Sequence, residues 1–425
     1  MKRTGLDGRL RDLFIGDVTS LGDRWRLLSI CLFAFCLPLA PVVLPLLMLL
    51  VIATHLVDRE VWRNRPVVRF DLFLPALWSV LLLLLHVAGM AWTANTDFGW
   101  FDVGIKLPLL LLPMLSFLPA VRRTGRDAVL FSFCAGNMAG VIICLVSAVF
   151  RATMPDGAGA SEFLSSSFSA MLHPSYFAWY LVTALACYFL GGLKDRLPRM
   201  EGIVLVGLLS IGLVLTESRM GWITLPLVLV WSLVAAWQDR WTRRVLLSVL
   251  VTSMLGGTAL AIFSEGVRYR VMELFTPTDP ATADAGASAA IRTVVWKAAW
   301  DVGNHNLPWG TGTGDVKDEL LLRYKEIGAV HAEERKLNAH NQFLQTFAAL
   351  GLPGFAALLL LILVPLARLL FRHDPDGSLR ACALVLIALN FNVESMLEVQ
   401  AGAVFTGFLL WVLWWPRAAV SSSRP

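Results

Sequence analysis

Residues 338–371 read NAHNQFLQTFAALGLPGFAALLLLILVPLARLLF, and this stretch decides the fold class of the chain. A polar segment ends at His340, and the apolar run after it is longer than the roughly 20 residues that cross a bilayer. Gly351 and the pair Pro353-Gly354 should interrupt the run, because glycine and proline both disfavour a helix interior. We therefore predict a short helix first and a membrane-spanning helix after it.

The rest of the chain is equally apolar. Hydrophobic residues make up 57% of the 425 residues, charged residues only 16%, and the mean hydropathy is +0.66, whereas a soluble domain carries about 25% charged residues. The six cysteines lie in apolar runs without a CxxC pair, so neither a disulfide framework nor a zinc site is indicated. These features predict an all-α polytopic membrane protein with about twelve transmembrane helices. The predicted crossings are 27–40, 42–57, 71–91, 103–119, 128–150, 173–191, 201–216, 220–237, 245–263, 341–371, 379–396 and 401–416.

Positive charge alternates between the connecting segments. Of the 36 Lys and Arg residues, 24 lie in every second segment and at the two ends, while the opposite short loops hold only Arg151 and Arg219. Because basic residues stay on the cytoplasmic side of bacterial membranes, both termini are predicted to be cytoplasmic. The predicted division is transmembrane helices 1–9 in 1–263, an outward loop at 264–340, helices 10–12 in 341–416, and a tail at 417–425.

The outward loop 264–340 differs from the other loops. It is long and of mixed charge, and loops of this length in a compact protein are usually functional or disordered. Residues 276–289 are expected to be flexible. Two amphipathic stretches, separated by Pro308–Gly314, favour an ordered helical lid. The residues at helical spacing are Ile291, Val294, Val295, Ala298 and Ala299 in the first stretch, and Val316, Leu320, Tyr324 and Ile327 in the second.

His340 is the strongest candidate for chemistry. It lies where the polar loop meets an apolar helix. In the structural alternative this segment is only an interfacial helix cap, with Asn338 as the N-cap. The N-terminus of a helix disfavours imidazolium, and its N–H groups attract phosphate. A neutral ring there can accept a proton near neutral pH. His340 is therefore either an interfacial helix cap or a general base, and we favour the base.

Three cationic residues are candidates for binding an anionic substrate. Arg219 lies in a tight outward turn between two apolar runs, where an arginine is costly and usually functional. Arg292 lies on the first loop helix, and arginine binds phosphate oxygens with two parallel hydrogen bonds. Lys106 lies inside a predicted span, where it either binds a phosphate or extends toward the interface. An ion pair for Arg219 and a solvated position for Arg292 are the structural alternatives.

Five further residues are possible supports for such a site. His173 opens the sixth predicted span, Asn341 follows the candidate base, and Trp296 lies one turn after Arg292. Arg268 and Arg270, just beyond the ninth span, would contact lipid phosphate as easily as substrate.

Other polar patterns are weaker. Glu394 and Glu398 lie near the outer end of the eleventh span and could orient a base, although the sequence selects neither. The string Gly310-x-Gly312-x-Gly314 could present N–H groups to an anion, but a flexible turn is the simpler interpretation. The Asp-x-Asp at 374–376 falls in a predicted cytoplasmic loop, so it cannot serve a metal-dependent sugar transferase acting outside. No P-loop and no serine nucleophile elbow occur, so the energy for a reaction would arrive in the substrate.

Taken together, these residues resemble the O-antigen ligase family, within the group that includes O-antigen polymerases and bacterial O-oligosaccharyltransferases. His340-Asn341, nine residues, Gly351, two residues and Gly354 look like the ligase signature. The turn at Thr216–Trp222 is similar to the family's Ser-Arg-x-Gly segment. Arg292 with Trp296, followed by Pro308–Gly314, is similar to its periplasmic-loop segment. The resemblance covers most of the chain.

The resemblance implies a GT-C-type glycosyltransferase fold in the bacterial inner membrane. The implied donor is a polysaccharide on undecaprenyl diphosphate, and the acceptor is a sugar hydroxyl of the lipid A–core oligosaccharide in the periplasm. His340 would take the proton from that hydroxyl, while Arg219 and Arg292, assisted by Lys106, would bind the diphosphate. A membrane-embedded groove would hold the prenyl tail, and the long loop would close over the sugars. The reaction would invert the anomeric centre, with no metal and no cofactor.

Several alternatives remain open from the sequence. A polymerase of the same group carries Arg-x10-Gly patterns, and Arg292 with Gly303 fits one, but 32 glycines in the chain make such matches common by chance. A protein O-oligosaccharyltransferase commonly carries a further periplasmic domain near its C-terminus. A lipid-linked sugar transporter would show two related halves with sites at the membrane midplane, whereas the polar residues here crowd one outer face. A scaffold protein without catalytic activity would not explain why arginines are buried in this chain.

Overall fold

The computed structural model describes residues 21–57, 74–117, 123–155, 157, 159–263, 268, 288–371, 374 and 376–415. All regular secondary structure within these ranges is helical, as predicted. The first half contains α2 (Leu21–Cys36), η1 (Pro41–Val43), α3 (Leu44–Val57), α5 (Pro75–Gly89), η2 (Met90–Trp92), α6 (Thr96–Lys106), α7 (Pro108–Met114), η3 (Leu115–Phe117), α8 (Arg123–Ala152), η4 (Gly159–Phe163), α9 (Ser165–Phe168), α10 (Pro174–Leu190) and η5 (Leu193–Asp195). The second half contains α11 (Arg199–Leu215), α12 (Arg219–Ala235), α13 (Arg240–Phe263), α15 (Ser288–His305), α16 (Val316–Glu326), α17 (Val330–Glu334), α18 (Gln342–Phe371), α19 (Gly377–Val393), η6 (Met396–Glu398) and α20 (Gln400–Val412).

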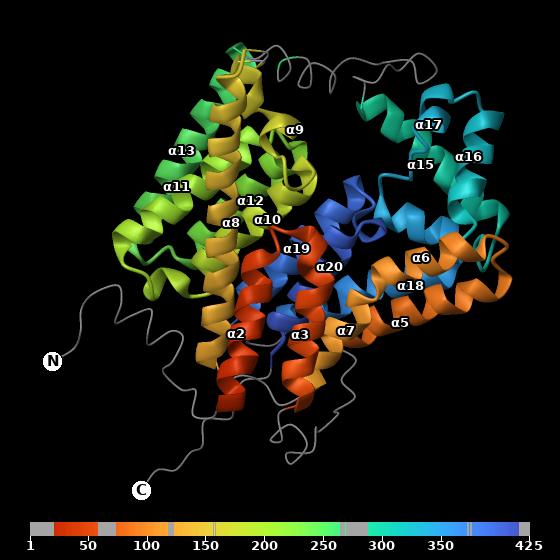
Figure 1. Ribbon diagram of the computed structural model, residues 1–425, viewed down its shortest axis with the longest axis horizontal. Coiled ribbons are helices and arrows are strands. Elements are labelled where there is room, and N and C mark those ends of the chain that lie inside the picture. Colours follow the sequence, from red (N-terminus) through yellow and green to blue (C-terminus); the bar gives the residue numbers. More distant parts are fainter. Residues whose placement is uncertain are drawn as a thin grey trace, which may run out of the picture.

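The helices form a bundle with a smaller group of helices at one side. In Figure 1, α8 and α11–α13 lie on one side, α5 and α18 run together on the other, and α15–α17 sit above them. Helix α10 lies at the centre, because nearly every residue from Pro174 to Phe189 is buried. Its Trp179 and Tyr180 rings pack against Phe405 of α20, with ring centroids 4.7 and 4.0 Å apart. The core therefore joins the middle of the chain to its last helix.

Several of these helices have the length and composition of membrane spans. Among the described residues, three are long and apolar enough to cross a bilayer, namely 75–92, 125–152 and 342–371. Shorter apolar helices are Pro41–Val57, Pro174–Leu190, Arg219–Ala235, Gly377–Val393 and Gln400–Val412. This pattern is consistent with a polytopic membrane protein. The number twelve, the GT-C type and the side of each loop stay predictions.

Most predicted helix positions agree with the structure, but one predicted helix is divided into two. The run 27–57 contains two helices, α2 and α3, separated around Pro41, as the prolines predict. The crossing predicted at 103–119 is not one continuous helix. Instead α6 ends at Lys106 and α7 begins at Pro108, because proline is compatible with the first turn of a helix but not with its interior.

The predicted interruption of the late apolar run is confirmed. Helix α18 breaks at Gly351, whose φ of 60° and ψ of −148° are accessible essentially only to glycine. The break frees carbonyl groups one turn earlier, and the linker between α15 and α16 satisfies them. Thr311 N–H donates to Ala348 O at 3.0 Å, and Gly312 N–H donates to Ala349 O at 2.9 Å. The kink is thus held by backbone hydrogen bonds from another part of the chain.

The sequence suggested that the glycine string 310–314 is either an anion site or a flexible turn, and the structure gives it a third role. Its N–H groups are occupied within the protein, since Gly312 bonds to α18 and Gly314 N–H donates to Thr93 Oγ1 at 3.2 Å. A Cβ on Gly310 would lie 2.5 Å from Gly351 N, and one on Gly314 would lie 2.1 Å from Asn95 O. The string is therefore a packed connector, neither an anion site nor a free turn. Close approach of backbone to backbone is what requires glycine here.

We expect Gly351→Ala to destabilise the protein strongly. An added Cβ would lie 2.0 Å from Pro308 O, and the backbone conformation disfavours any side chain by about 1–3 kcal/mol before that clash. A loss of several degrees in the thermal unfolding midpoint of the detergent-purified protein would show this. Gly207→Ala is the matched control, because a Cβ at that position of α11 meets nothing within 4 Å. Equal unfolding midpoints for the two variants would contradict the proposed role of the kink.

The helical periodicity predicted for the outward loop is confirmed in the described residues. Val295, Ala298 and Ala299 of α15 and Val316, Leu320 and Tyr324 of α16 are buried in one cluster, which packs on Ala348–Leu350 of α18. Ile327 is 41% exposed, so its predicted place on this face is wrong, because α16 ends at Glu326. Residues 264–267 and 269–287, including Arg270 and most of the segment expected to be flexible, lie outside the described residues. That the loop acts as a lid stays a prediction.

Candidate active site

The backbone at His340 has an uncommon conformation. Its φ of 44° lies in the left-handed region, which side-chain-bearing residues rarely adopt outside special sites. The Asn338 Oδ1 accepts a hydrogen bond from the His340 N–H at 2.9 Å. Asn338, the N-cap in the structural alternative, does not cap the helix, because the chain turns at His340 and α18 begins only at Gln342. Asn341 caps it instead, since its Oδ1 accepts from Leu344 N–H at 3.1 Å.

The His340 ring is paired with a carboxylate from a distant part of the chain. His340 Nδ1 lies 2.7 Å from Glu394 Oε1, at the end of α19. The carboxylate is 11% exposed and the imidazole 27% exposed, so the acid lies beneath the ring and the ring reaches solvent. An ionised carboxylate accepts the proton of Nδ1–H, which leaves Nε2 as the proton acceptor. This is the arrangement of a general base oriented by an acid.

The next two residues hold the same α19–α20 connection. Asn341 N–H donates to Ser395 Oγ at 3.2 Å, and Asn341 Nδ2 donates to Asn392 O at 2.9 Å. Gln342 Oε1 accepts from Leu397 N–H at 2.6 Å. Three consecutive residues, 340–342, thus bind one short segment, 392–398. The predicted supporting role of Asn341 has a geometric basis in these bonds, although its effect on a reaction stays a prediction.

Three basic side chains act on the Glu394 carboxylate. Burial alone would raise the pKa of Glu394, but the hydrogen bond from His340 and the charges of His340, Arg292 and His173 lower it overall. Desolvation lowers the pKa of His173, and the positive charges of His340 and Arg292 lower it further, against the opposing effect of Glu394. His340, Arg292 and His173, which the sequence placed in three separate segments, thus all act electrostatically on Glu394.

Helix α15 is attached to this group through Trp296. The indole Nε1 donates a hydrogen bond to His340 O at 3.3 Å. Because residues four apart share a helix face, Arg292 is presented on the same face as Trp296. Arg292 thus lies on the face of α15 that Trp296 attaches to His340, and its role in binding diphosphate stays a prediction.

Arg219 is the first residue of α12, at the turn that the sequence predicted. Helix α11 ends at Leu215, Glu217 has a left-handed φ of 48°, and Ser218 caps α12 by accepting from Gly221 N–H at 3.3 Å. A Cβ on Gly221 would lie 3.0 Å from Ala178 Cβ, so the start of α12 packs on the first turns of α10, the helix that His173 caps. Arg219 is half-buried there. Its diphosphate role stays a prediction, as do those of Arg268, which is exposed, and of Arg270.

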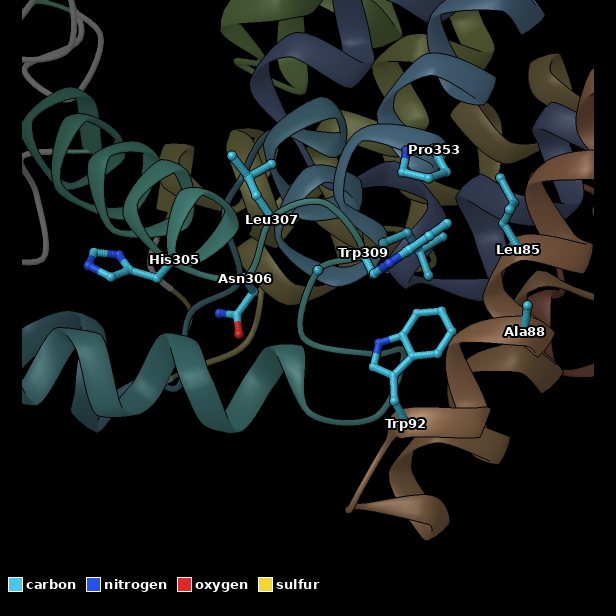
Figure 2. A pocket seen from close by; sticks show the side chains of 10 residues that line it. Leu85, Ala88, Trp92, His305, Asn306, Leu307, Trp309 and Pro353 are labelled. Atoms are coloured by element: carbon cyan, nitrogen blue, oxygen red, sulfur yellow. The ribbon is translucent and has the colours of Figure 1, made fainter.

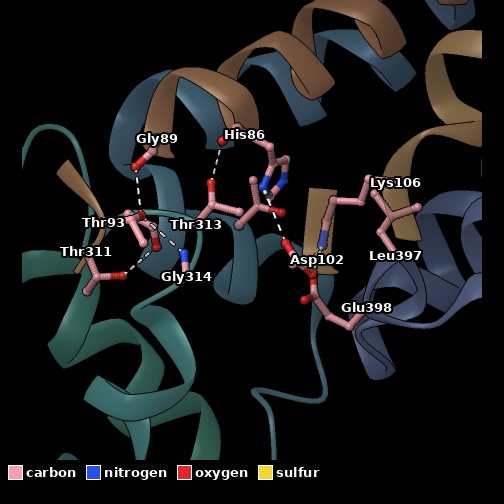
Figure 3. Close-up of polar contacts among 12 residues, drawn as sticks. His86, Gly89, Thr93, Asp102, Lys106, Thr311, Thr313, Gly314, Leu397 and Glu398 are labelled. Carbon is pink, nitrogen blue, oxygen red and sulfur yellow. Dashed lines mark hydrogen bonds and ion pairs between the residues drawn. The ribbon is translucent and has the colours of Figure 1, made fainter. Parts of the chain in front are cut away.

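Lys106 has an environment that the sequence did not predict. Its ammonium is fully buried, and it lies 2.5 Å from Asp102 Oδ1 and 3.1 Å from Glu398 Oε1 (Figure 3). The structure thus surrounds it with two carboxylates, whereas it groups Arg292 with His340. A direct phosphate contact by Lys106 stays a prediction, and its burial favours another role.

An apolar cavity opens next to the kink of α18. Its volume is about 600 Å³, and it lies between the end of α5, the linker after α15 and the break in α18 (Figure 2). The rings of Trp92 and Trp309, whose centroids are 6.5 Å apart, also line it, and both are exposed. Leu85, Leu350 and Pro353 line its apolar wall, while His305 and Asn306 supply polar groups at one end. Such a cavity suits an amphiphile with an apolar chain.

The residue that sequence reasoning did not select is Glu394. The pattern shows it only as one of two acids near the end of an apolar run, 54 positions from His340. The signal that could have found it is the cost of a carboxylate at membrane depth, which requires a partner such as a histidine. That rule applies equally to Glu398, whose partner is Lys106. Only the three-dimensional path of residues 394–399 shows that Glu394 pairs with His340 and Glu398 with Lys106.

Comparison with known proteins supports the family resemblance. Residues 203–359 match the family model described as O-antigen ligase, which is consistent with membership of that family. The match includes the Arg219 turn, α15 and the first part of α18 with His340. An uncharacterized protein of Haemophilus influenzae is 24% identical over 225 residues, which are 50% of this chain. The matched region spans about half the length of that relative, 55%.

Proposed function

We propose, from the O-antigen ligase match and the His340–Glu394 pair, that this chain is a membrane glycosyltransferase acting as an O-antigen ligase. It transfers a polysaccharide from undecaprenyl diphosphate to a hydroxyl of the lipid A–core oligosaccharide, on the periplasmic face of the bacterial inner membrane. The observation that carries this proposal is the 2.7 Å contact between His340 Nδ1 and Glu394 Oε1. Arg292 lies one turn before Trp296, whose indole bonds to His340 O. A base and a phosphate-binding cation in one place are what such a transfer needs.

The reaction is a displacement at the anomeric carbon of the donor sugar. His340 Nε2 removes the proton from the acceptor hydroxyl, while the oxygen of that hydroxyl forms a bond to the anomeric carbon of the donor sugar. The bond from the carbon to the diphosphate oxygen breaks, and the diphosphate leaves on the prenyl carrier. Attack opposite the leaving group inverts the configuration. Glu394 stabilises the imidazolium that forms, because a buried carboxylate interacts strongly with a charge 2.7 Å away.

Arginines stabilise the negative charge that develops on the leaving diphosphate. Arg292 lies one turn before Trp296, which bonds to His340 O, and Arg219 begins a helix whose N-terminal N–H groups add positive potential. Diphosphate is already a good leaving group, so electrostatic stabilisation replaces a general acid and we propose a metal-independent transfer. The roles of Arg219 and Arg292 rest on the resemblance and on the position of α15.

The apolar cavity beside the α18 kink is our candidate for the prenyl tail. The first part of α18 runs from Gln342 to Leu350, roughly 13 Å at 1.5 Å per residue, and so connects the base to the cavity wall. A diphosphate near Arg292 would leave its apolar tail free to lie along Leu350 and Pro353. The exposed Trp92 and Trp309 suit the boundary between polar and apolar phases.

We expect Arg219→Lys to weaken binding of undecaprenyl diphosphate. Lysine keeps the charge but cannot form the two parallel hydrogen bonds of a guanidinium, so we expect a loss of about tenfold in affinity. Binding of the diphosphate carrier to the purified variants measures this directly. Arg243→Lys is the control, since that residue lies on α13 over the Trp237 ring. Unchanged affinity and transfer rate in Arg219→Lys would remove Arg219 from the site.

A polymerase or a protein O-oligosaccharyltransferase of the same group would use the same chemistry with another acceptor. The polymerase would transfer to a second lipid-linked polysaccharide, and the protein transferase to a serine or threonine hydroxyl. The His340–Glu394 pair serves all three, so the acceptor has to be identified from the product.

A further inference from the structure

A buried ion cluster lies at the end of α6, next to the candidate site but separate from it. The Lys106 ammonium contacts Asp102 Oδ1 at 2.5 Å and Glu398 Oε1 at 3.1 Å, and the three side chains are 0%, 5% and 13% exposed. His86 of α5 also faces the cluster, with Nδ1 3.8 Å from Asp102 Oδ2 (Figure 3). Buried charges are costly, and removing one partner of such a group leaves the others uncompensated. The cluster therefore fixes α6 firmly against the segment that carries Glu398.

That segment is the one that carries Glu394. Glu398 Oε1 accepts a hydrogen bond from Gln342 Nε2 at 3.2 Å, and Gln342 Oε1 accepts from Leu397 N–H at 2.6 Å. Gln342 lies two residues after His340, and Glu398 lies four residues after Glu394. Short polar contacts thus connect the Lys106 cluster to Gln342 and to residues 397–398, which lie two and three to four residues along the chain from His340 and Glu394.

Direct contact of Lys106 with a phosphate is disfavoured by its surroundings. An ammonium has three N–H donors, and two carboxylates are already within reach of them. A phosphate brought to this point would add a third anion to a buried site with more negative than positive groups. The exposed fraction of the lysine side chain is zero, so a ligand reaches it only if the surrounding helices separate.

We infer that Lys106 is a positioning residue for the general base: by holding Glu398, its ammonium keeps residues 394–398 in the position where Glu394 meets His340. Lys106 touches neither substrate nor reacting atom, and it acts through Glu398 and Gln342. The expected effect of Lys106 on the reaction rate rests on the proposed function. The arrangement of the hydrogen bonds does not depend on which acceptor the enzyme uses.

The test compares Lys106→Met with the double variant Lys106→Met/Glu398→Gln. In the single variant two carboxylates are left without their cation, so Glu398 moves and kcat falls by about 100-fold, the usual cost of a misplacement near 1 Å. The KM for undecaprenyl-diphosphate-linked polysaccharide stays within about twofold. In the double variant the positive and one negative charge are removed together, and the glutamine amide still bonds to Gln342. We expect kcat to recover by about tenfold or more.

The second readout does not depend on the reaction. The proton on His340 Nδ1 gives a low-field NMR signal in protein labelled with ¹⁵N-histidine when it is bonded to Glu394. We expect this signal to disappear in Lys106→Met and to return in the double variant. His340→Gln identifies the signal. If the wild-type enzyme transfers no glycan, the proposed function fails while the NMR result still decides the positioning role.

Two results would overturn the inference. An unchanged Nδ1–H signal in Lys106→Met, together with a raised KM for the lipid diphosphate, would show that Lys106 binds substrate. A double variant that folds but recovers neither kcat nor the signal would show that Glu398 does not transmit the effect of Lys106.

Discussion

His340→Ala is expected to abolish glycan transfer while the protein still inserts and folds. The ring both reaches solvent and receives its orientation from Glu394, as a general base requires. Loss of a general base costs about 10²- to 10⁴-fold in rate. Its removal leaves the hydrophobic clusters intact, because the His340 side chain belongs to neither of them.

The measurement is the amount of polymer-capped lipopolysaccharide in cells that carry only the variant. His331→Ala is the matched control, because His331 lies in the same long segment before α18, on α17. Equal membrane levels of the two variants show that insertion is unaffected. Normal capping in the His340→Ala cells would exclude the base role.

Glu394→Gln is expected to have a comparably large effect, about 10³-fold on kcat. Glutamine has nearly the same shape, but its NH₂ group can donate to Nδ1, and the proton would then reside on Nε2, where it blocks base action. The charge that stabilises the imidazolium is lost as well. In serine proteases the corresponding change of the aspartate to asparagine lowers kcat by about 10⁴-fold, because it favours the wrong histidine tautomer.

Steady-state kinetics of purified Glu394→Gln and of the surface control Glu326→Gln test this prediction. Glu326 pairs with Arg323 on α16 and is 65% exposed. Acidification of the wild type from pH 8 to 6 should not reproduce the variant, because the pKa of Glu394 lies below its ordinary value and the carboxylate stays ionised. A variant with more than half of the wild-type kcat would show that His340 is oriented by other means.

Much of the fold followed from local patterns. Gly351 and Pro41 interrupt apolar runs where backbone chemistry requires it, and the helical spacing around Val295 predicted a packed loop helix. The break at Leu107 was missed, because Pro108 was counted inside an apolar run instead of being treated as a helix start. Sequence patterns predict a structural feature correctly when the residues that cause it lie within a few positions of it.

The site was predicted only in part, for a physical reason. The ligase-like signature and the Arg292–Trp296 spacing led to His340 and to Trp296, whose indole does bond to His340 O. The pairing of Glu394 with His340 and of Glu398 with Lys106 depends on how the α19–α20 connection folds over α18. The spacing of residues along the sequence does not predict that path. The left-handed backbone of His340 likewise moved the N-cap from Asn338 to Asn341. Long-range pairing of buried charges is decided by the tertiary structure.

The most direct test of the central claim is transfer by the purified protein in proteoliposomes. The donor is undecaprenyl-diphosphate-linked polysaccharide, the buffer contains EDTA, and three acceptors are offered separately: rough lipopolysaccharide, a second lipid-linked polysaccharide, and a serine-rich protein. We predict that polysaccharide appears on the lipopolysaccharide alone, and that His340→Ala and Glu394→Gln remove this product. Product on either of the other acceptors, or undiminished transfer by both variants, would contradict the account.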